Sequence, residues 1–230
     1  MMTQHDRQPR AAIGKSRPAQ VGELPSVDWS VAAGWRNIPG LSSNVSDILD
    51  ELGYRLSVPA TCIPSRLPGS RVVGRAVTLQ YLPERRSHEL AGDGLIHKSA
   101  MELTSSGDVL VIAGDGIGQY SVFGGLAAHR AVECGIAGII VDGAVRDVDQ
   151  LADLRFPVWS RGVTPTTGRA RLQGVGINVP IRLHDVQVLP GDIVVADDSG
   201  ICFVPADVLR EVDRRLRELI EEEAHILGSK

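Results

Sequence analysis

The pattern of apolar positions along the chain predicts an α/β fold built around a buried sheet. Two short runs, at residues 108–113 and 136–141, are apolar almost without interruption. Strands without polar alternation are typical of burial on both faces, as in a parallel or mixed sheet with helices outside. Short β-branched runs between turn residues predict further strands at 72–81, 156–159, 179–183, 186–188, 193–196 and 201–204. The strands crowd into the second half, which we expect to wrap into the same core.

Helical spacing and capping residues predict the helices between these strands. The first helix is expected from Asn44 to Leu52, with Ser42 or Ser43 as its cap and Gly53 closing it. Further helical segments are expected at residues 88–103, 124–134, 150–154 and 206–227. The last of these is amphipathic, and residues 142–147 and 162–176 are interpreted as loops.

Residues 1–25 are polar and aperiodic, with a mild excess of basic side chains. Such a stretch cannot bury enough apolar surface to become ordered, so we interpret it as a disordered tail. A solvated tail is the simpler interpretation, and a partner-binding arm is the alternative. Residues 26–230 contain no internal repeat and are expected to form a single α/β domain that includes the C-terminal amphipathic helix.

Composition restricts the kind of partner. The 230 residues are 43% hydrophobic but only 4% aromatic, so the core must be largely aliphatic. A formal net charge of −4 gives no general attraction to nucleic acid or to an anionic membrane surface. No apolar run reaches the roughly 18 residues of a membrane span, and no signal-peptide core is recognisable. The three cysteines are widely spaced, which fits reduced thiols, so we expect a cytoplasmic protein.

The most informative chemistry lies in two glycines and an Arg-Asp pair. Gly124 and Gly125 open the helix predicted over residues 124–134, and Arg146 and Asp147 follow the next buried strand. Free N–H groups at a helix start bind anions, and a planar guanidinium binds a carboxylate through two hydrogen bonds. A carboxylate is also a hard oxygen ligand for a divalent cation. Together these groups suit a small α-keto acid bound on a metal.

Simpler interpretations of these and other polar residues remain open. An Arg-Asp pair can be an ion pair on a surface turn, and Asp197 to Gly200 is most simply a hairpin turn. Asp115 lies where loops carry ligands, and the simpler interpretation is that it only shapes its own turn. His129 follows Gly125 by one helical turn and could point near the site, although a position facing solvent is the simpler expectation. The histidines do not have the spacing of a metal cluster.

The chain resembles the 4-hydroxy-4-methyl-2-oxoglutarate aldolase family, which includes the regulator of ribonuclease activity A (RraA) proteins, formerly mislabelled as demethylmenaquinone methyltransferases. The segments that carry the resemblance are 124–127, 135–147, 45–50, 73–78 and 190–200. The match covers roughly residues 40 to 205, and its central motif is specific. The resemblance implies a layered α/β/β fold like the swivelling phosphohistidine domain, in homo-oligomers of three or six subunits with sites at subunit interfaces.

The resemblance also implies roles for individual residues. Arg146 would hold the keto-acid carboxylate, and Asp147 would bind Mg²⁺ or Mn²⁺ directly or through water. The backbone amides of the segment would contact the substrate; its residues are Gly124, Gly125, Leu126 and Ala127. The acidic position of the family motif falls on Gly125. Either another carboxylate replaces it, or this protein takes a different keto acid.

The resulting hypothesis is a metal-dependent lyase that cleaves a pyruvate-containing 4-hydroxy-2-oxo acid, decarboxylates oxaloacetate, or does both. Its expected partners are the small keto acid and further copies of the same chain, with no nucleic acid and no membrane. The alternative is a non-catalytic, ring-shaped regulator that binds a ribonuclease complex. Asp147 argues against this alternative, because the ribonuclease regulators tend to lack it. Methyl transfer is a weaker alternative, since no adenosylmethionine loop is recognisable.

Overall fold

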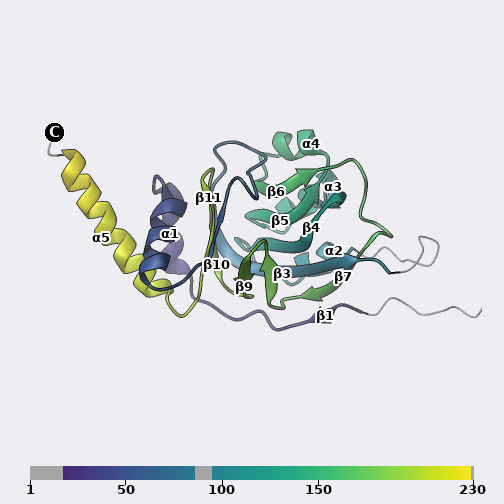
Figure 1. Ribbon diagram of the computed structural model, residues 1–230, viewed down its shortest axis with the longest axis horizontal. Helices are drawn as coiled ribbons and strands as arrows, with labels where there is room; N and C mark the ends of the chain where they lie inside the picture. Colours follow the sequence, from purple (N-terminus) through teal and green to yellow (C-terminus); the bar gives the residue numbers. More distant parts are fainter. Residues whose placement is uncertain (1–17, 86–94, 229–230) are drawn as a thin grey trace, which may run out of the picture.

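A computed structural model describes residues 18–85 and 95–228, and one mixed sheet organises that part of the chain (Figure 1). Neighbouring strands follow the order β2-β11-β10-β3-β4-β5-β6, with β7 beside β3, and β1 beside β7. The strands of this sheet are β1 (Gln20–Val21), β2 (Ser57–Pro59), β3 (Val72–Pro83), β4 (Val109–Phe123), β5 (Gly138–Val145), β6 (Val158–Val163), β7 (Leu172–Ile177), β10 (Ile193–Ala196) and β11 (Gly200–Val204). A separate hairpin joins β8 (Ile181–Leu183) to β9 (Val186–Val188).

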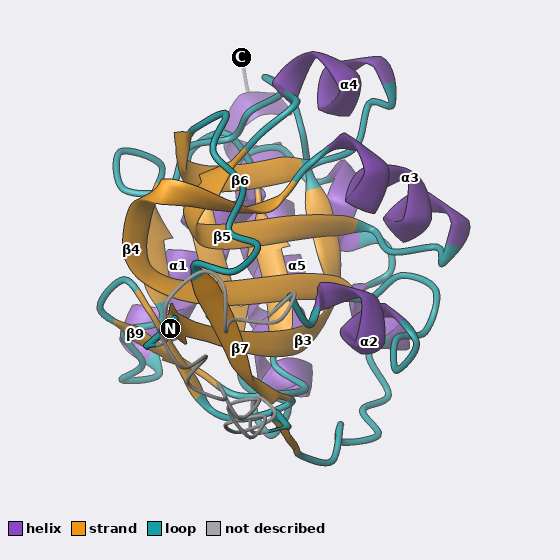
Figure 2. Cartoon of the chain, turned by 90° about the vertical axis from the view of Figure 1, so that its right-hand side faces the viewer, coloured by secondary structure: helices purple, strands orange, loops and turns teal. Residues whose placement is uncertain are grey.

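Helices lie at two places around this sheet. The α-helices are α1 (Leu41–Glu51), α2 (His97–Met101), α3 (Gly125–Glu133), α4 (Val148–Asp153) and α5 (Leu209–Gly228), and two short 3₁₀ helices are η1 (Ser30–Ala32) and η2 (Trp35–Asn37). Helices α1 and α5 lie together beside β10 and β11, and α2, α3 and α4 lie at the opposite end (Figures 1 and 2). The α/β class predicted from the sequence is confirmed.

Strands β3, β4, β5 and β6 run parallel, and this parallel block positions the site. The strands β10 and β7 pair antiparallel with β3, which makes the sheet mixed. Every residue of β5 is buried, as expected for a strand covered on both faces. Since parallel strands end at the same edge, the segments after β4 and β5 lie side by side.

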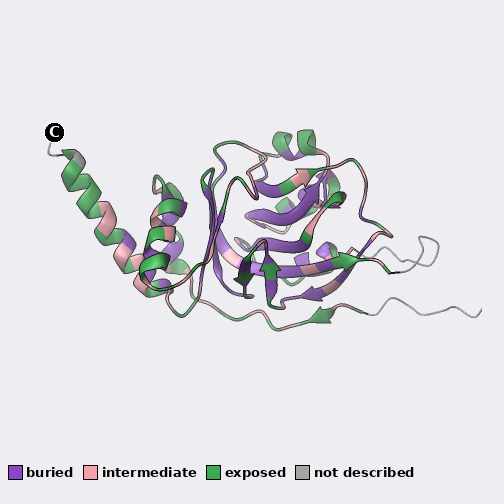
Figure 3. Ribbon diagram, viewed as in Figure 1, coloured by how far each residue is buried: buried purple, intermediate pink, exposed green. Residues whose placement is uncertain are grey.

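Apolar side chains pack on both sides of the sheet. One cluster joins α2 and α3 to the parallel strands, with Ile112, Phe123 and Ile139 among its buried members. A second lies beneath the β8-β9 hairpin and contains Trp159 and Phe203. A third joins α1 and α5 to β10 and β11. Buried residues therefore run through the centre of the molecule, and exposed ones gather on the outer helices (Figure 3).

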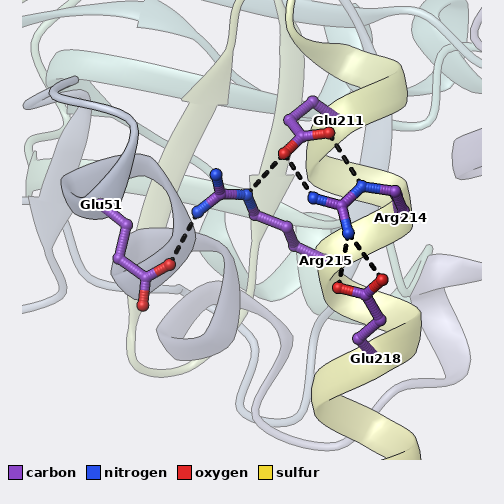
Figure 4. A network of polar contacts seen from close by, with 5 residues as sticks. All are labelled: Glu51, Glu211, Arg214, Arg215 and Glu218. Atoms are coloured by element: carbon purple, nitrogen blue, oxygen red, sulfur yellow. Dashed lines mark hydrogen bonds and ion pairs between the residues drawn. The ribbon is translucent and has the colours of Figure 1, made fainter.

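The C-terminal helix α5 binds the body through its first half. Leu209, Val212 and Leu216 are buried against α1 and the neighbouring strands, as expected for an amphipathic helix. Its second half projects away from the body and is exposed (Figures 1 and 3). Ion pairs also connect α5 to α1, where Arg215 contacts Glu51 at 2.8 Å (Figure 4). These pairs are exposed to solvent, so the apolar stripe carries most of the attachment.

Two strands run further than the hydrophobic pattern predicted. Strand β4 continues beyond residue 113, through bulges in its pairing with β5, to Phe123. Strand β5 continues through Asp142 to Val145, so the loop predicted over residues 142–147 is wrong up to that point. The Asp142 carboxylate is buried, and it accepts hydrogen bonds from Arg161 Nε at 2.7 Å and from the His184 backbone N–H at 2.8 Å. These partners allow a charged residue inside a buried strand.

The loop predicted over residues 162–176 is also wrong at its ends, because β6 extends to Val163 and β7 begins at Leu172. The glycines that suggested a loop instead permit close packing. A Cβ on Gly174 would stand 2.3 Å from the Ile96 side chain.

Two predicted helices also differ from the structure. A helix is predicted over residues 88–103, and the structure has the shorter helix α2, His97–Met101, in that range. Residues 88–94 lie outside the described residues. Ser42 does not cap α1, which begins after Gly40; it lies in the first turn and bonds Asp197 instead.

The N-terminal stretch interpreted as a tail is described only from residue 18 onward. Within it, Gln20 and Val21 form β1, which pairs in parallel with β7. Residues 1–17 lie outside the described residues. In residues 18–85 and 95–228, no helix combines the length and apolar character needed to cross a bilayer.

Candidate functional site

The ends of β4 and β5 bring the two parts of the predicted motif together. Gly124 follows β4 in an extended conformation, and α3 begins at Gly125. Arg146 follows β5, and its backbone N–H donates to the Phe123 carbonyl at 3.0 Å. Residues 22 positions apart thus meet at one edge of the sheet. The structure places Gly124, Gly125, Arg146 and Asp147 in direct contact, as the motif predicted.

The Asp147 carboxylate lies against the first turn of α3. Its Oδ2 accepts a hydrogen bond from the Gly125 N–H at 3.1 Å, and Arg146 Nε lies 3.4 Å from the same oxygen. Asp147 has left-handed backbone angles, φ 55° and ψ 44°, as it leads into α4. An Asp tolerates this region better than most residues, and the turn directs its side chain toward α3. Among the described residues, no group donates to Oδ1, which leaves this oxygen available to a ligand.

Gly124 allows the Arg146 and Asp147 side chains to approach the backbone. A Cβ at this position would stand 2.7 Å from Asp147 Oδ2 and 2.7 Å from Arg146 Cγ. Real side chains do not tolerate such distances, so any larger residue would displace both groups. The requirement for glycine here comes from space, because the φ of −165° is open to any residue.

Gln150 is the site residue that sequence reasoning missed. A Cβ on Gly125 would stand 1.9 Å from Gln150 Oε1 and 2.7 Å from its Cδ. The carboxamide therefore fills the space that a side chain at position 125 would occupy. The side chain found there is neutral, and it is not the replacement carboxylate that the family motif suggested. A signal was present: Gln150 follows Asp147 by three residues at the start of a helix, and helical side chains lean toward the N-terminus.

A cavity of about 590 Å³ opens beside Gly124 and Arg146. Its wall is formed by apolar groups such as Met101, Val122 and Phe123. Its charged lining residues are Lys98, Glu102, Arg130, Glu133, Arg146 and Arg169. Four cationic side chains against two carboxylates favour an anionic ligand.

Of the predicted substrate-binding segment, Gly124, Leu126 and Ala127 line this cavity, and Leu126 is 78% exposed at its edge. Gly125 and Asp147 do not line it and lie beside it at the start of α3.

The acidic residues fit one kind of metal site and not another. No group of three or more His, Cys, Asp or Glu side chains in the described part of the chain is arranged to hold a metal ion. A closed structural zinc site needs four such ligands. Mg²⁺ is commonly held by one or two carboxylates and keeps several waters or substrate oxygens. Asp147, half-buried with Oδ1 free, fits that second kind of site.

The other polar candidates have separate positions. His129 is exposed and lines the cavity, and the buried His97 lines it as well. Asp115 has a φ of 48° and lies 3.9 Å from Arg182, an exposed pair away from the cavity. None of these three side chains contacts the Asp147 carboxylate through a hydrogen bond.

Asp197 is confirmed as part of the turn between β10 and β11. Its carboxylate accepts hydrogen bonds from Ser42 Oγ at 2.6 Å and from the Ser199 N–H at 2.8 Å. Burial acts to raise the pKa of Asp197, but these bonds outweigh it and hold the pKa below its ordinary value. The carboxylate therefore fastens α1 to the hairpin.

Comparison with known proteins identifies the family. A model described as RraA-like, aldolase/RraA, matches residues 42–203. The chain belongs to the aldolase/RraA family. That membership confirms the resemblance seen in the motif, and the matched region contains the whole candidate site.

Individual known proteins are similar over much of the chain. A putative 4-hydroxy-4-methyl-2-oxoglutarate aldolase of Halalkalibacterium halodurans is 35% identical over 164 residues, which are 65% of this chain and 73% of that protein. Protein DlpA of Legionella pneumophila is 32% identical over 173 residues, 74% of this chain. The match spans only 27% of the length of DlpA.

A solved family structure shares the fold. Streptomyces coelicolor RraAS2, described as an unusual member of the RNase ES inhibitor RraA protein family, superimposes with a TM-score of 0.75 at 30% identity. The superposition covers 90% of this chain and 98% of that one. The family fold implied by the motif is therefore confirmed.

Proposed function

We propose that this member of the aldolase/RraA family is a divalent-metal-dependent carbon–carbon lyase acting on a pyruvate-containing keto acid. The reaction is retro-aldol cleavage of a 4-hydroxy-2-oxo acid, decarboxylation of oxaloacetate, or both. The observation that carries the proposal is the contact of Asp147 and Arg146 with the first turn of α3, beside a cationic cavity. The aldolase name of the Halalkalibacterium relative supports the same reaction class.

Arg146 binds the keto-acid carboxylate in this proposal. Its side chain is 42% exposed and lines the cavity, and its guanidinium can donate two parallel hydrogen bonds to a carboxylate. Since the backbone of Arg146 is fixed to Phe123 by a hydrogen bond, the guanidinium starts from a rigid strand end. Fixed orientation of the substrate is one of the larger contributions an enzyme can make to rate.

Asp147 would hold Mg²⁺ or Mn²⁺ by its carboxylate, which the Gly125 N–H keeps in place through Oδ2. When bound, the cation supplies Lewis-acid stabilisation of the negative charge that develops on the keto oxygen as the carbon–carbon bond breaks. The remaining N–H groups at the start of α3 add positive potential on the same side, because a helix N-terminus favours negative charge. The segment from Gly124 to Ala127 thus contributes backbone groups to the substrate.

We also propose that the chain works as a closed homo-oligomer of three or six subunits. Leu126, Val148 and Val163 are large apolar side chains with 78%, 39% and 49% of their surface exposed, and the first two flank the candidate site. Burial of such groups against a second copy is favourable. Light scattering at micromolar concentration tests this assembly, and a stable monomer would contradict it.

The deciding experiment measures pyruvate released from oxaloacetate and from 4-hydroxy-4-methyl-2-oxoglutarate in the presence of Mg²⁺ or Mn²⁺. Metal without protein measures spontaneous decarboxylation of oxaloacetate, and Arg146→Ala measures any contaminating enzyme. Release that needs both protein and metal, and that Arg146→Ala loses, supports the proposal. Absence of release from both substrates with either metal contradicts it.

The second candidate function is a non-catalytic regulator that binds a ribonuclease complex. The observation in its favour is the similarity to RraAS2, whose description places it in the RNase ES inhibitor family. Gly125 adds to it, since this position has no side chain with which to assist catalysis. If the pyruvate assay is negative, co-purification with a ribonuclease complex becomes the experiment that distinguishes this candidate.

A further inference from the structure

Gln150 and Gly125 form a coupled pair at the start of α3. The Gln150 carboxamide covers the bare α-carbon of Gly125, in a space where a Cβ would stand 1.9 Å from Oε1. The backbone N–H of the same glycine donates to Asp147 at 3.1 Å. The first residue of α3 is therefore contacted by a carboxylate on one side and by a carboxamide on the other.

The position of Gln150 depends on local geometry that the sequence supports. Helix α4 contacts α3, and Gln150 lies in its first turn, three residues after Asp147. A residue in this turn can direct its side chain back toward the helix start, where the Asp147 and Gly125 groups lie. Because position 125 is glycine, no side chain competes for that space.

The neutrality of Gln150 decides the charge of the site. A carboxylate in the same place would contact the same glycine whose N–H donates to Asp147. Two carboxylates this close attract a divalent cation more strongly, and they repel an anionic ligand. A carboxamide is neutral, so it neither strengthens the attraction for a cation nor repels an anion. It also offers a hydrogen-bond donor as well as an acceptor.

We propose that Gln150 is a specificity-determining residue, which keeps the site at a single carboxylate and so favours binding of a dianionic keto-acid ligand over tight binding of the metal. This inference rests on the proposed function and assigns Gln150 a part in it. The chemical class it would select is a small, planar dianion. Oxalate has that shape and charge and serves as the probe.

The test compares Gln150→Glu with the parent, because the substitution adds a charge with almost no change in shape. Mg²⁺ and Mn²⁺ affinities are measured by calorimetry without keto acid, and oxalate affinity is measured at saturating metal. We expect metal affinity to rise about tenfold and oxalate affinity to fall about tenfold, a modest change because Gln150 is exposed and water screens its charge. A role limited to packing would move neither affinity.

Gln187→Glu is the matched control. It makes the same change of net charge at an exposed position of β9, away from α3 and α4 (Figure 2). Gln150→Ala removes the carboxamide without adding charge, so it should leave metal affinity unchanged and lower oxalate affinity only a fewfold, the scale of one hydrogen bond. Melting curves of all variants establish that each is folded.

The outcomes separate this inference from the proposed function. If the parent binds metal and oxalate but Gln150→Glu behaves like Gln187→Glu, the inference about Gln150 is overturned and the lyase proposal stands. If both affinities move in the same direction, the charge assignment is wrong. A parent that binds neither metal nor oxalate overturns the proposed function and this inference together.

Discussion

The Asp147 carboxylate holds the start of α3 by accepting the Gly125 N–H at 3.1 Å across 22 residues of sequence. One oxygen, Oδ2, makes this contact, and the proposed metal would bind the other. Oδ2 thus has a structural role, and Oδ1 has the proposed ligand role. This division allows the two roles to be tested separately.

Asp147→Asn should weaken metal binding and preserve the fold. Asparagine keeps an oxygen that can accept the Gly125 N–H, but it loses the negative charge that hard cations prefer. We expect metal affinity to fall by at least about tenfold and pyruvate release to fall steeply even at high metal concentration. Calorimetry together with a melting curve measures both effects. Asp149→Asn, an exposed carboxylate on the same helix, is the control. A folded Asp147→Asn protein that binds metal like the parent would exclude Asp147 as the ligand.

Arg146→Lys should weaken recognition of the keto acid without removing positive charge. Lysine cannot reproduce the two parallel hydrogen bonds of a guanidinium. We expect kcat/KM to fall by an amount equivalent to about 2–3 kcal/mol, on the scale of a charged hydrogen-bonded pair. Steady-state kinetics on the best substrate measure this, with Arg155→Lys, an exposed turn residue, as the control. Unchanged kcat/KM in Arg146→Lys would rule out the proposed contact.

Alanine at the two neighbouring glycines should have different consequences. Gly124→Ala places a methyl group 2.7 Å from Asp147 Oδ2 and from Arg146 Cγ, so both groups must move. Gly125→Ala mainly meets the carboxamide end of Gln150, at 1.9 Å from Oε1, and this end can swing into solvent; Gln150 Cβ, at 3.1 Å, must give by only a few tenths of an ångström. We therefore expect Gly124→Ala to lower both metal and oxalate affinity, and Gly125→Ala to reproduce the smaller effect of Gln150→Ala. Calorimetry measures both, and equal effects of the two substitutions would contradict the different surroundings of the two glycines.

Asp192 should make the protein less stable as pH rises from about 4 to about 6. Burial raises the pKa of Asp192 to about 6; a hydrogen bond from the Leu189 N–H opposes this rise, and the charge of Asp207 adds to it. Between the ordinary pKa near 4 and the raised value, the folded state holds a proton that the unfolded state has released. The stability that protonated Asp192 contributes, about 2–3 kcal/mol, is therefore fully present below pH 4 and is lost as pH rises through 6.

Asp192→Asn removes this titration and keeps an oxygen that can accept the Leu189 N–H. Denaturant unfolding of the parent and the variant at pH 4 and pH 7 measures the difference. The variant should gain stability relative to the parent at pH 7 and not at pH 4. A difference that is the same at both pH values would show that Asp192 does not titrate in this range.

The sequence by itself determined the family, the α/β class and the pairing of Gly124 and Gly125 with Arg146 and Asp147. These follow from information that is local along the chain. A buried strand between two helices has a clear hydrophobic signature, and parallel strands end at one edge. The family motif then indicated which polar residues at that edge are expected to carry the chemistry.

Only the tertiary structure decided where β4 and β5 end and what fills the space beside Gly125. Asp142 looked like the first residue of a loop, and β5 passes through it because Arg161 and His184, distant in sequence, satisfy its buried carboxylate. Gln150 looked like an ordinary surface residue of a helical turn, and its place over Gly125 arises from the packing of α4 against α3. Such contacts depend on distances between separate elements, and periodicity along one element does not record them.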